Sequence, residues 1–383
     1  MPATRRQFLQ AAAAAAGALS LSAGRSFATE RRISKSPEPL RILILGGTGF
    51  IGPHEIKYAL ARGHQVSIFN RGRSQPSLYP ELYSQVQWLK GDRNGDFAAL
   101  EGREWDAVID NAAMIPRWVR ESAGLLKDAA SQYLYISTLS VFGGFPDPGM
   151  DETWPVATID DPTVEEVNGQ TYGPLKALCE QEAEKAFPGR ATVVRPGLIV
   201  GPGDPSDRWT YWPVRINKGG EVLAPGDPNT LVRYIDVRDV TEWSIRLLEQ
   251  RTAGVFNAVG PRSHLSMAEM LYGIRATTND AISFTWADTD FLSEHGVRPW
   301  ADMPAWLPPR DGYAGYGSIS RDRAIAAGLT FRPLAVTASE TFAWWMTLDE
   351  ERRQNPKAGL TPEREAEILA AWHARAEKND TRR

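Results

Sequence analysis

Tyr172 and Lys176, four positions apart, are the residues with the clearest potential for chemistry in this sequence of 383 residues. Residues 172–187 are predicted to form a helix, on which side chains four positions apart lie on one face. A lysine charge beside a phenol favours the phenolate and lowers its pKa, so that the phenol can exchange a proton near neutral pH. The pair predicts general acid–base catalysis, and the alternative is a surface pair without function.

A glycine-rich turn at residues 46–52 has the features of a phosphate-binding site. Residues 42–45 (ILIL) predict a strand buried on both faces of a parallel sheet, and residues 52–62 predict a helix. The GxxGxxG spacing allows a tight turn and lets a phosphate approach backbone N–H groups. Strand, turn and helix together favour dinucleotide binding over a structural turn. The predicted contacts are Gly46, Gly47, Thr48, Gly49, Phe50, Ile51 and Gly52.

The bulk composition is that of a soluble globular enzyme. Apolar residues make up 42% of the chain and charged residues 23%. The net charge of −4 argues against nucleic acid as a partner. The five histidines show no metal-ligand spacing, so we predict no metal site and expect a small-molecule substrate.

Residues 1–28 are similar to a twin-arginine export signal. The segment 4–9 (TRRQFL) precedes an alanine-rich stretch, and residues 26–28 (SFA) offer small residues to a signal peptidase. The stretch is too short and too alanine-rich for a stable membrane span. We therefore expect an exported, periplasmic or extracytoplasmic protein with no membrane span after leader removal. The alternative is an ordinary amphipathic N-terminal tail. Residues 29–40 read as a linker.

From residue 41 onwards, predicted strands alternate with predicted helices. Such alternation implies parallel crossover units and a doubly wound α/β sheet. The predicted strands are 65–69, 86–89, 107–109, 133–136, 192–194, 231–237 and 254–258, and helices are expected at 121–130, 240–249 and 361–376. We expect a nucleotide-binding domain at 41–200, a substrate-binding region at 201–348 with part of 231–260 returning to the sheet, and a C-terminal helical tail at 349–383.

The order of four motifs resembles that of the extended short-chain dehydrogenase/reductases, the NAD-dependent epimerase/dehydratase family. The motifs are the glycine turn 46–52, the segment 137–143 (STLSVFG), the Tyr172–Lys176 pair and the segment 195–197 (RPG). The resemblance covers residues 41 to 249. It implies a Rossmann-like doubly wound parallel sheet with a smaller C-terminal substrate-binding domain.

The resemblance implies a role for each catalytic residue. Tyr172 is the acid or base on the substrate oxygen, Lys176 tunes it and holds the nicotinamide ribose, and Thr138 orients the substrate oxygen. Hydride passes between the substrate carbon and the nicotinamide. The further cofactor contacts that the resemblance implies are Asp92, Arg93, Ala112, Ala113 and Pro196.

The residues after the second strand bear on the choice between NAD and NADP. An acidic residue there would bind the ribose diol of NAD, but the sequence reads Asn70-Arg71-Gly72-Arg73. Asn70 can bond either ribose, and Arg71 and Arg73 can pair with a 2′-phosphate. This favours NADP; the alternative is NAD with solvated loop arginines.

Aromatic and basic residues outside these motifs are candidates for substrate binding. The resemblance implies that members acting on nucleotide diphosphate sugars often carry a diphosphate-binding arginine where this chain has Val232. Arg233 is one residue away, on the other face of the strand. Residues 201–228 are expected to be loops over a cleft. Trp209, Trp212, Trp300 and Trp306 lie in expected loops, where they either line a pocket for a ring or a sugar face or pack. The predicted substrate contacts are Arg117, Trp118, Arg208, Trp209, Tyr211 and Arg233, which suit a polar, ring-bearing or anionic ligand.

These observations lead to three functional hypotheses. The first is an NAD(P)-dependent oxidoreductase or epimerase of a sugar-like or polyol substrate, which retains its cofactor because export offers no nucleotide pool. The second is an ordinary NADP-dependent carbonyl reductase. The third is a non-catalytic, RNA- or ligand-binding member of the fold. The resemblance also suggests a homodimer formed through two helices, whose candidate contacts are Leu125, Leu126, Ala177 and Leu178.

Overall fold

The structure is a computed structural model and describes residues 33–111, 113–278 and 281–380. The expected leader at residues 1–28 lies outside the described residues, as does the first part of the linker. The chain divides into two units, Met1–Lys35 and Ser36–Arg383. All helices and strands described below belong to the second unit.

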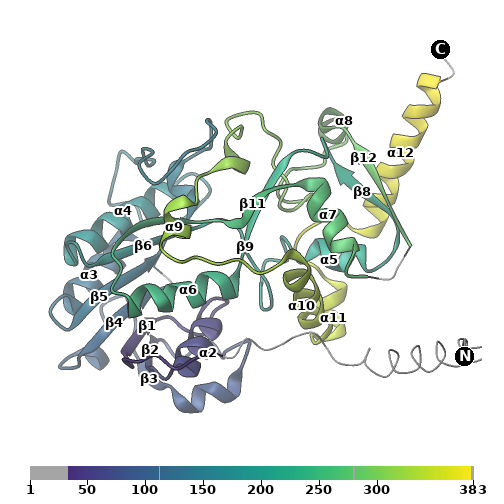
Figure 1. Cartoon of the computed structure of the whole chain (residues 1–383). Coiled ribbons are helices and arrows are strands. Elements are labelled where there is room, and N and C mark those ends of the chain that lie inside the picture. Colours follow the sequence, from purple (N-terminus) through teal and green to yellow (C-terminus); the bar gives the residue numbers. More distant parts are fainter. Residues whose placement is uncertain (1–32, 112, 279–280, 381–383) are drawn as a thin grey trace, which may run out of the picture. The chain divides into compact units, whose positions relative to one another are not determined.

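A seven-stranded parallel sheet, in the order β10-β6-β5-β4-β1-β2-β3, forms the first half of the fold (Figure 1). The order reverses between β1 and β4, which is where open α/β sheets bind ligands at the carboxyl ends of their strands. The doubly wound α/β prediction is confirmed. The strands are β1 (Arg41–Leu45), β2 (Gln65–Asn70), β3 (Gln87–Lys90), β4 (Trp105–Asp110), β5 (Ala130–Ile136), β6 (Ala191–Pro196) and β10 (Gly254–Ala258).

Helices cover both faces of this sheet because its central strands are apolar on both faces. Ile42 and Ile44 of β1 pack in one cluster with residues of α2 and α6, whereas Leu43 and Leu45 pack in another with residues of α3 and α4. The helices around the sheet are α2 (Gly52–Arg62), α3 (Pro116–Leu126), α4 (Tyr172–Ala186), α6 (Val237–Glu249) and α9 (Asp322–Ala326). The 3-10 helices of this half are η1 (Pro80–Gln85), η2 (Ala98–Leu100) and η3 (Leu139–Phe142).

The predicted helix at 121–130 is wrong in its position. Helix α3 begins at Pro116, because proline suits the first turn of a helix, where no N–H is needed. It ends at Leu126, and Ala130 already pairs with Trp105 as the first residue of β5. Leu126 and Ala177 are buried inside the chain, so two of the four predicted dimer contacts are not available to a partner.

A second hydrophobic core is formed by residues after β6. Its strands are β7 (Ile199–Val200), β8 (Gly220–Pro225), β9 (Leu231–Asp236), β11 (Gly260–Ser266) and β12 (Ile282–Ala287), which form the sheets β11-β9-β7 and β12-β8. Its helices are α5 (Tyr211–Ile216), α7 (Met267–Arg275), α8 (Thr289–Glu294), α10 (Leu334–Met346) and α12 (Pro362–Asp380). The elements η4 (Tyr316–Ser318) and α11 (Glu350–Gln354) also follow β6 in the chain but contribute no residue to this core. No helix of the described residues is both long and apolar enough to cross a bilayer.

The expectation of long loops at 201–228 is wrong, because this segment contains α5 and β8. Trp209, Trp212 and Trp306 are almost fully buried in the second core, so they pack there instead of lining a pocket. Tyr211 is buried in the same core. The indole of Trp212 donates a hydrogen bond of 2.7 Å to the carbonyl of Pro304, which satisfies its one polar group.

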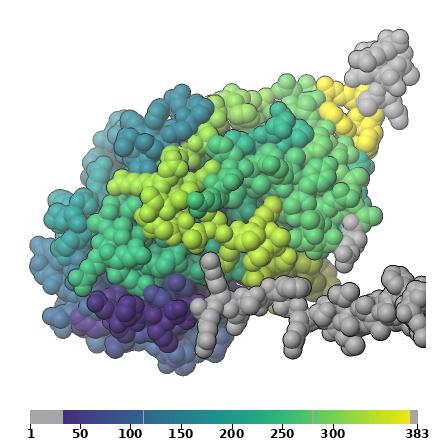
Figure 2. Space-filling model, in the orientation of Figure 1, coloured from purple at the N-terminus to yellow at the C-terminus, as the bar shows by residue number. Residues whose placement is uncertain are grey.

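The segment after η4 connects the second core with the seven-stranded sheet. Helix α9 packs beside β10, and the indole of Trp243 on α6 donates to the carbonyl of Ala327 at 2.9 Å. In the space-filling view of Figure 2, this yellow-green segment lies at the surface over the green residues of α6. Residues far beyond the first half of the chain therefore cover one face of the parallel sheet.

Candidate active site

The glycine turn between β1 and α2 is packed against the sheet at two positions and open at a third. A Cβ atom on Gly47, whose φ is +94°, would lie 2.7 Å from Cγ2 of Ile68 on β2. A Cβ atom on Gly52 would overlap the backbone of Gly47. At Gly49 a Cβ atom would meet nothing within 4 Å. The turn is therefore held closely by its neighbours and leaves room for a ligand beside Gly49.

The start of α2 has the free N–H groups that a phosphate needs. No side chain of the described residues caps this helix, and its N-cap is Ile51, which has no acceptor to offer. The hydroxyl of Tyr83 donates to the carbonyl of Gly47 at 2.6 Å and so fixes the turn from the sheet side. Open space and uncapped N–H groups together fit the diphosphate of a dinucleotide.

Asn70 holds the glycine turn in place, which differs from the ribose contact expected of it. Its Nδ2 donates to the carbonyl of Gly46 at 3.0 Å, and its Oδ1 accepts from the backbone N–H of Gly72 at 2.8 Å and from the indole of Trp88 at 3.0 Å. Its side-chain oxygen is therefore already engaged. Arg71 and Arg73, the predicted partners of a 2′-phosphate, are exposed.

Arg93 is neutralised by a buried carboxylate at the end of β4. Its Nη2 lies 2.5 Å from Oδ1 of Asp110, whose Oδ2 also accepts from the hydroxyl of Tyr133 at 2.6 Å. Burial raises the pKa of Asp110, but the charge and hydrogen bond of Arg93, together with the hydrogen bond from Tyr133 and the charge of Lys176, keep it below its usual value. Arg93 thus stabilises the carboxyl end of β4. Asp92 beside it accepts from the backbone N–H of Asn94 at 3.0 Å.

Lys176 lies beside the carboxyl ends of β4 and β5, where its ammonium group contacts two main-chain carbonyls. Its Nζ donates to the carbonyl of Ile136 at 2.7 Å and to that of Ala113 at 3.0 Å, and lies 4.2 Å from the ring centre of Tyr135. Burial lowers the pKa of this lysine to about 8. Ala112, a predicted cofactor contact, lies outside the described residues.

Tyr172 and Thr138 meet where α4 packs against η3. Tyr172 is the first residue of α4, and Thr138 follows β5 and caps η3 by accepting from the N–H of Ser140 at 3.1 Å. A Cβ atom on Gly173 would overlap the carbonyl of Ser140. Only glycine lets the helix approach this closely, so the residue after Tyr172 helps to bring the two hydroxyls together.

A buried ion pair connects the elements that carry these two residues. The guanidinium of Arg195 on β6 lies 2.6 Å from Oε2 of Glu180 on α4. The hydroxyl of Ser137, next to Thr138, donates to Oε1 of the same carboxylate at 2.5 Å. The network ties α4, β5 and β6 together. Pro196, the last residue of β6, is buried and pairs with Ala258 of β10.

The pKa of Tyr172 differs from the sequence-based expectation. Burial raises it above the usual value, while the hydrogen bond with Thr138 and the charge of Arg208 lower it. Lys176 was expected to supply the lowering charge, but its Nζ is directed to the two carbonyls described above. Arg208 is therefore the cation that acts on the phenol in this structure.

The six predicted substrate contacts do not form one group. Trp209 and Tyr211 belong to the second core. Arg117 pairs with Glu165 at 2.6 Å, and the indole of Trp118 donates to Oδ1 of Asn94 at 3.0 Å. Only Arg208 and Arg233 remain without a carboxylate partner among the described residues.

Three aromatic residues connect these two arginines. The guanidinium of Arg233 lies 4.1 Å from the ring centre of Tyr316, which meets the ring of Trp300 edge to face at 6.0 Å. The guanidinium of Arg208 lies 5.6 Å from the ring centre of Trp300. Phe145, just after η3, contacts both Arg233 and Tyr316. Sequence reasoning missed Phe145 and Tyr316, since no local pattern marks them.

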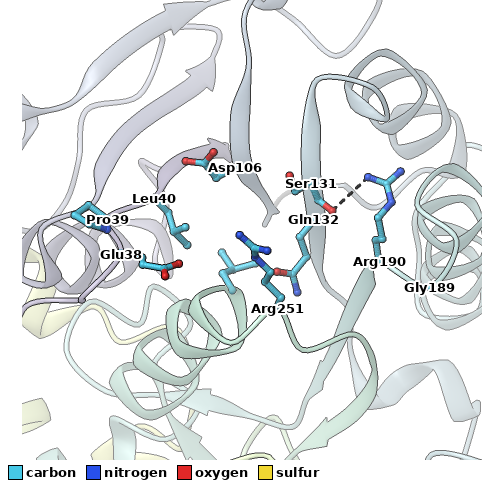
Figure 3. Close-up of a pocket in the computed structure, with 10 residues that line it drawn as sticks. Glu38, Pro39, Leu40, Asp106, Ser131, Gln132, Gly189, Arg190 and Arg251 are labelled. Carbon is cyan, nitrogen blue, oxygen red and sulfur yellow. Dashed lines mark hydrogen bonds between the residues drawn. The ribbon is translucent and has the colours of Figure 1, made fainter.

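A cavity lies away from these residues (Figure 3). It has a volume of about 430 Å³ and lies at the amino ends of the parallel strands, opposite to the glycine turn. Arg190, which donates to the carbonyl of Ser131 at 3.3 Å, forms part of its wall. The other lining residues are Glu38, Pro39, Leu40, Asp106, Gln132, Gly189, Leu248 and Arg251.

Comparison with protein families gives one match along the first two thirds of the chain. Residues 42–126 and 123–259 match the model of the NAD dependent epimerase/dehydratase family. These residues include the glycine turn, Thr138, Tyr172 and Lys176. The match ends before η4 and all of the helices from α7 onwards, so Trp300 and Tyr316 lie outside it.

Individual proteins resemble the chain more distantly. The dTDP-4-dehydro-6-deoxy-D-allose reductase of Streptomyces bikiniensis is 26% identical over 61% of this chain and 80% of its own length. The chloroplast stem-loop binding protein of 41 kDa b of Arabidopsis thaliana is also 26% identical, over 60% of this chain and 61% of its own length. The crystal structure of UDP-glucuronic acid 4-epimerase from Bacillus cereus with NAD is 17% identical over 79% of this chain and 96% of its own, with a TM-score of 0.57.

Proposed function

This chain belongs to the NAD dependent epimerase/dehydratase family, and we propose that it uses NAD(P) to transfer hydride to or from a hydroxyl-bearing carbon of a sugar-like or polyol substrate. It is an NAD-dependent epimerase or oxidoreductase by its family. One observation carries the more specific proposal. Thr138 and Tyr172 lie at the carboxyl edge of the sheet, the edge at which the glycine turn is open beside Gly49.

The hydroxyl groups of Tyr172 and Thr138 carry out the proton transfer and the positioning of the substrate oxygen. A bound nicotinamide would supply the acceptor or donor of hydride at this site. As the substrate alcohol becomes a carbonyl, the phenolate of Tyr172 takes the hydroxyl proton, and in the reverse direction the phenol returns it. The hydroxyl of Thr138 donates a hydrogen bond to the substrate oxygen and holds it beside Tyr172.

Lys176 and Arg208 divide the two roles that the sequence assigned to Lys176 alone, namely positioning the nicotinamide ribose and stabilising the phenolate of Tyr172. Lys176 holds the carbonyls of Ala113 and Ile136 and so fixes the strand ends against which the nicotinamide ribose would lie. Arg208 stabilises the phenolate of Tyr172 by its charge. The arrangement therefore supports proton transfer without requiring Lys176 to contact the phenol.

The cofactor proposed is NADP in preference to NAD. The exposed Arg71 and Arg73 follow β2, where the adenine ribose of a dinucleotide is expected. No carboxylate ends β2, since Asn70 occupies that position and is engaged with Gly46 and Gly72. A 2′-phosphate would thus meet positive charge and no repulsion.

We further propose that the protein is exported and carries its nucleotide with it. The support is the twin-arginine motif in residues 4–9, which precedes an alanine-rich stretch. An enzyme outside the nucleotide pool must regenerate its cofactor within each cycle, as an epimerase does when it oxidises and re-reduces one carbon.

Two measurements test this function. Mass spectrometry of protein purified without added nucleotide should find NADP or NAD in near-stoichiometric amount, and an empty protein that binds either nucleotide only weakly would refute the retained cofactor. Nicotinamide absorbance should then change when sugars and polyols are added in turn. Tyr172→Phe should keep the nucleotide and lose this change, because it removes only the proton-transfer group. Undiminished activity of that variant would refute the assignment of Tyr172.

A further inference from the structure

Arg233 is a buried cation that has no carboxylate partner among the described residues. Its side chain leaves β9 and is almost fully enclosed, with the residue 1% exposed. None of its three guanidinium nitrogens makes a hydrogen bond of normal geometry within the described part of the chain. The guanidinium has five N–H donors, and apart from a weak interaction with the hydroxyl of Tyr316 they are left without an acceptor in a place that water reaches poorly.

The groups around Arg233 do not neutralise it. Phe145 and Tyr316 present their rings to the guanidinium, at 5.3 and 4.1 Å from the ring centres. Burial lowers the pKa of Arg233 to about 10; the charge of and a hydrogen bond with Tyr316 oppose this, and the charge of a second arginine, Arg321, lowers the pKa further. Burial also raises the pKa of Tyr316, so this phenol is neutral at pH 7. No carboxylate of the described residues acts on Arg233.

A buried arginine in such surroundings destabilises the protein. An uncompensated buried charge costs several kcal/mol, and contacts with aromatic rings return only a part of this. Such an arrangement is typical of a binding site whose ligand carries the opposite charge.

We propose that Arg233 binds a compact oxyanion of the substrate, a carboxylate or a phosphate ester, while the hydroxyl-bearing carbon of the same molecule lies at Tyr172. This inference rests on the proposed function. The contacts from Arg233 through Tyr316 and Trp300 lead to Arg208, and Phe145, which also faces Arg233, follows η3, the 3-10 helix that is capped by Thr138. The anion site and the acid–base site are therefore neighbours.

The face of β9 that carries Arg233 differs from that of Val232. Val232 is buried in the second core together with Trp209, whereas Arg233 faces Phe145 and Tyr316. The side chain at 232 therefore has no access to the aromatic residues beside η3. The anion would be held by a guanidinium between rings, which suits a small planar carboxylate or a phosphate.

The test compares the thermal stabilisation that ligands cause in two variants. One variant lacks the proposed proton-transfer group and the other lacks the proposed anion-binding group. The probes are D-glucuronate, glucose 6-phosphate, UDP-glucose and, as the uncharged control, D-glucose, each at 10 mM, about the level needed to see a millimolar ligand. Tyr172→Phe should keep the melting-temperature shift caused by an anionic probe, since binding does not need proton transfer. Arg233→Met should lose that shift and, without ligand, melt higher than the wild type because the uncompensated charge is gone.

The outcomes separate this inference from the proposed function. Stabilisation by glucuronate or by glucose 6-phosphate identifies which oxyanion is bound, and UDP-glucose alone would point to a diphosphate instead and overturn the compact anion. An equal shift with D-glucose, or a lower melting temperature of unliganded Arg233→Met, would overturn the anion site. If anions stabilise the protein through Arg233 but no probe changes the nicotinamide absorbance, the anion site stands and the proposed hydride transfer fails.

Discussion

Arg352 of α11, which is half-buried, forms an ion pair with the buried carboxylate of Asp207, the residue next to Arg208. Its Nη2 lies 2.6 Å from Oδ1 and 2.7 Å from Oδ2 of the carboxylate, which also accepts from the backbone N–H of Lys357 at 2.8 Å. Asp207 is 1% exposed and has a φ of +59°, a conformation that aspartate tolerates better than most residues. The C-terminal part of the chain thus fixes the segment that brings a positive charge to Tyr172.

Removing this arginine should destabilise the protein strongly. In Arg352→Met the carboxylate of Asp207 would remain buried without its partner, which costs about 3–5 kcal/mol. The free energy of unfolding, measured by urea denaturation at pH 7.5, should fall by that amount. Arg353→Met on the same helix is the control, since Arg353 pairs with no carboxylate in the part of the chain that the structure describes, and its loss should change little. Equal effects of the two substitutions would contradict the role of the pair.

Two glycines of the first turn should respond to substitution in opposite ways. Gly49→Val places a side chain in open space, so the melting temperature should stay near that of the wild type, while bound nucleotide should drop about tenfold or more because the diphosphate loses its room. Gly52→Ala overlaps the backbone of Gly47 and should lower the melting temperature by several degrees. Nucleotide content and differential scanning fluorimetry measure both effects. A loss of stability in Gly49→Val would show that the space is not a ligand site.

The first half of the fold could be predicted because its signals are local. Residues 42–45 are continuously apolar, and their faces pack against different helices, which only a strand buried on both sides can do. The turn and helix that follow have glycines and a proline at the positions where geometry demands them. Helix α3 was misplaced because the pairing of Ala130 with Trp105 is a tertiary contact, which overrides the local preference of the same residues for helix.

The substrate side could not be predicted in the same way. Trp209 and Trp212 lie in a stretch rich in glycine and proline, which indicates loops, yet both are buried in the second core. Arg233 was predicted as a substrate contact only because it is basic. Its neighbours Phe145 and Tyr316 come from segments that are distant in the sequence. A sequence shows which residues are charged, but the folded chain decides which of them lack a partner.

The buried Glu55 on α2 should make stability depend on pH. Its Oε2 accepts from Nδ2 of Asn111 at 2.5 Å, and burial raises its pKa from 4.5 to about 8. Between these values the folded protein holds a proton that the unfolded chain has released, so the free energy of unfolding falls as the pH rises, by at most about 1.4 kcal/mol per pH unit. Glu55→Gln should remove this slope and be the more stable protein at pH 8.

Urea denaturation of both proteins at pH 5 and pH 8 gives the comparison. Glu81→Gln, which replaces an exposed carboxylate, is the control and should leave the slope unchanged. If Glu55→Gln shows the same loss of stability with pH as the wild type, Glu55 is not the group that titrates.

The arginines after β2 should decide between the two cofactors. In a double substitution of Arg71 and Arg73 by alanine, the dissociation constant for NADP should rise about tenfold or more, since charge-assisted hydrogen bonds to a phosphate contribute about 1.5–3 kcal/mol. Binding of NAD, which lacks the 2′-phosphate, should change little. Titration of nucleotide-free protein with each cofactor measures the ratio, and an equal loss for both would refute the preference for NADP.

The charge of Arg208 should set the pH at which Tyr172 works. Oxidation of an alcohol requires the phenolate, so its rate rises with pH through the pKa of Tyr172. Burial raises that pKa, and Arg208 opposes the rise. In Arg208→Gln the phenolate loses a stabilising charge, so the rising limb of the pH–rate profile should move to higher pH. Ser206→Ala removes the hydrogen bond of 3.1 Å to Nε of Arg208 but keeps the charge, and should move the limb less. An unchanged limb in Arg208→Gln would mean that another cation acts on Tyr172 once substrate and cofactor are bound, with Lys176 the nearest alternative on the same helix.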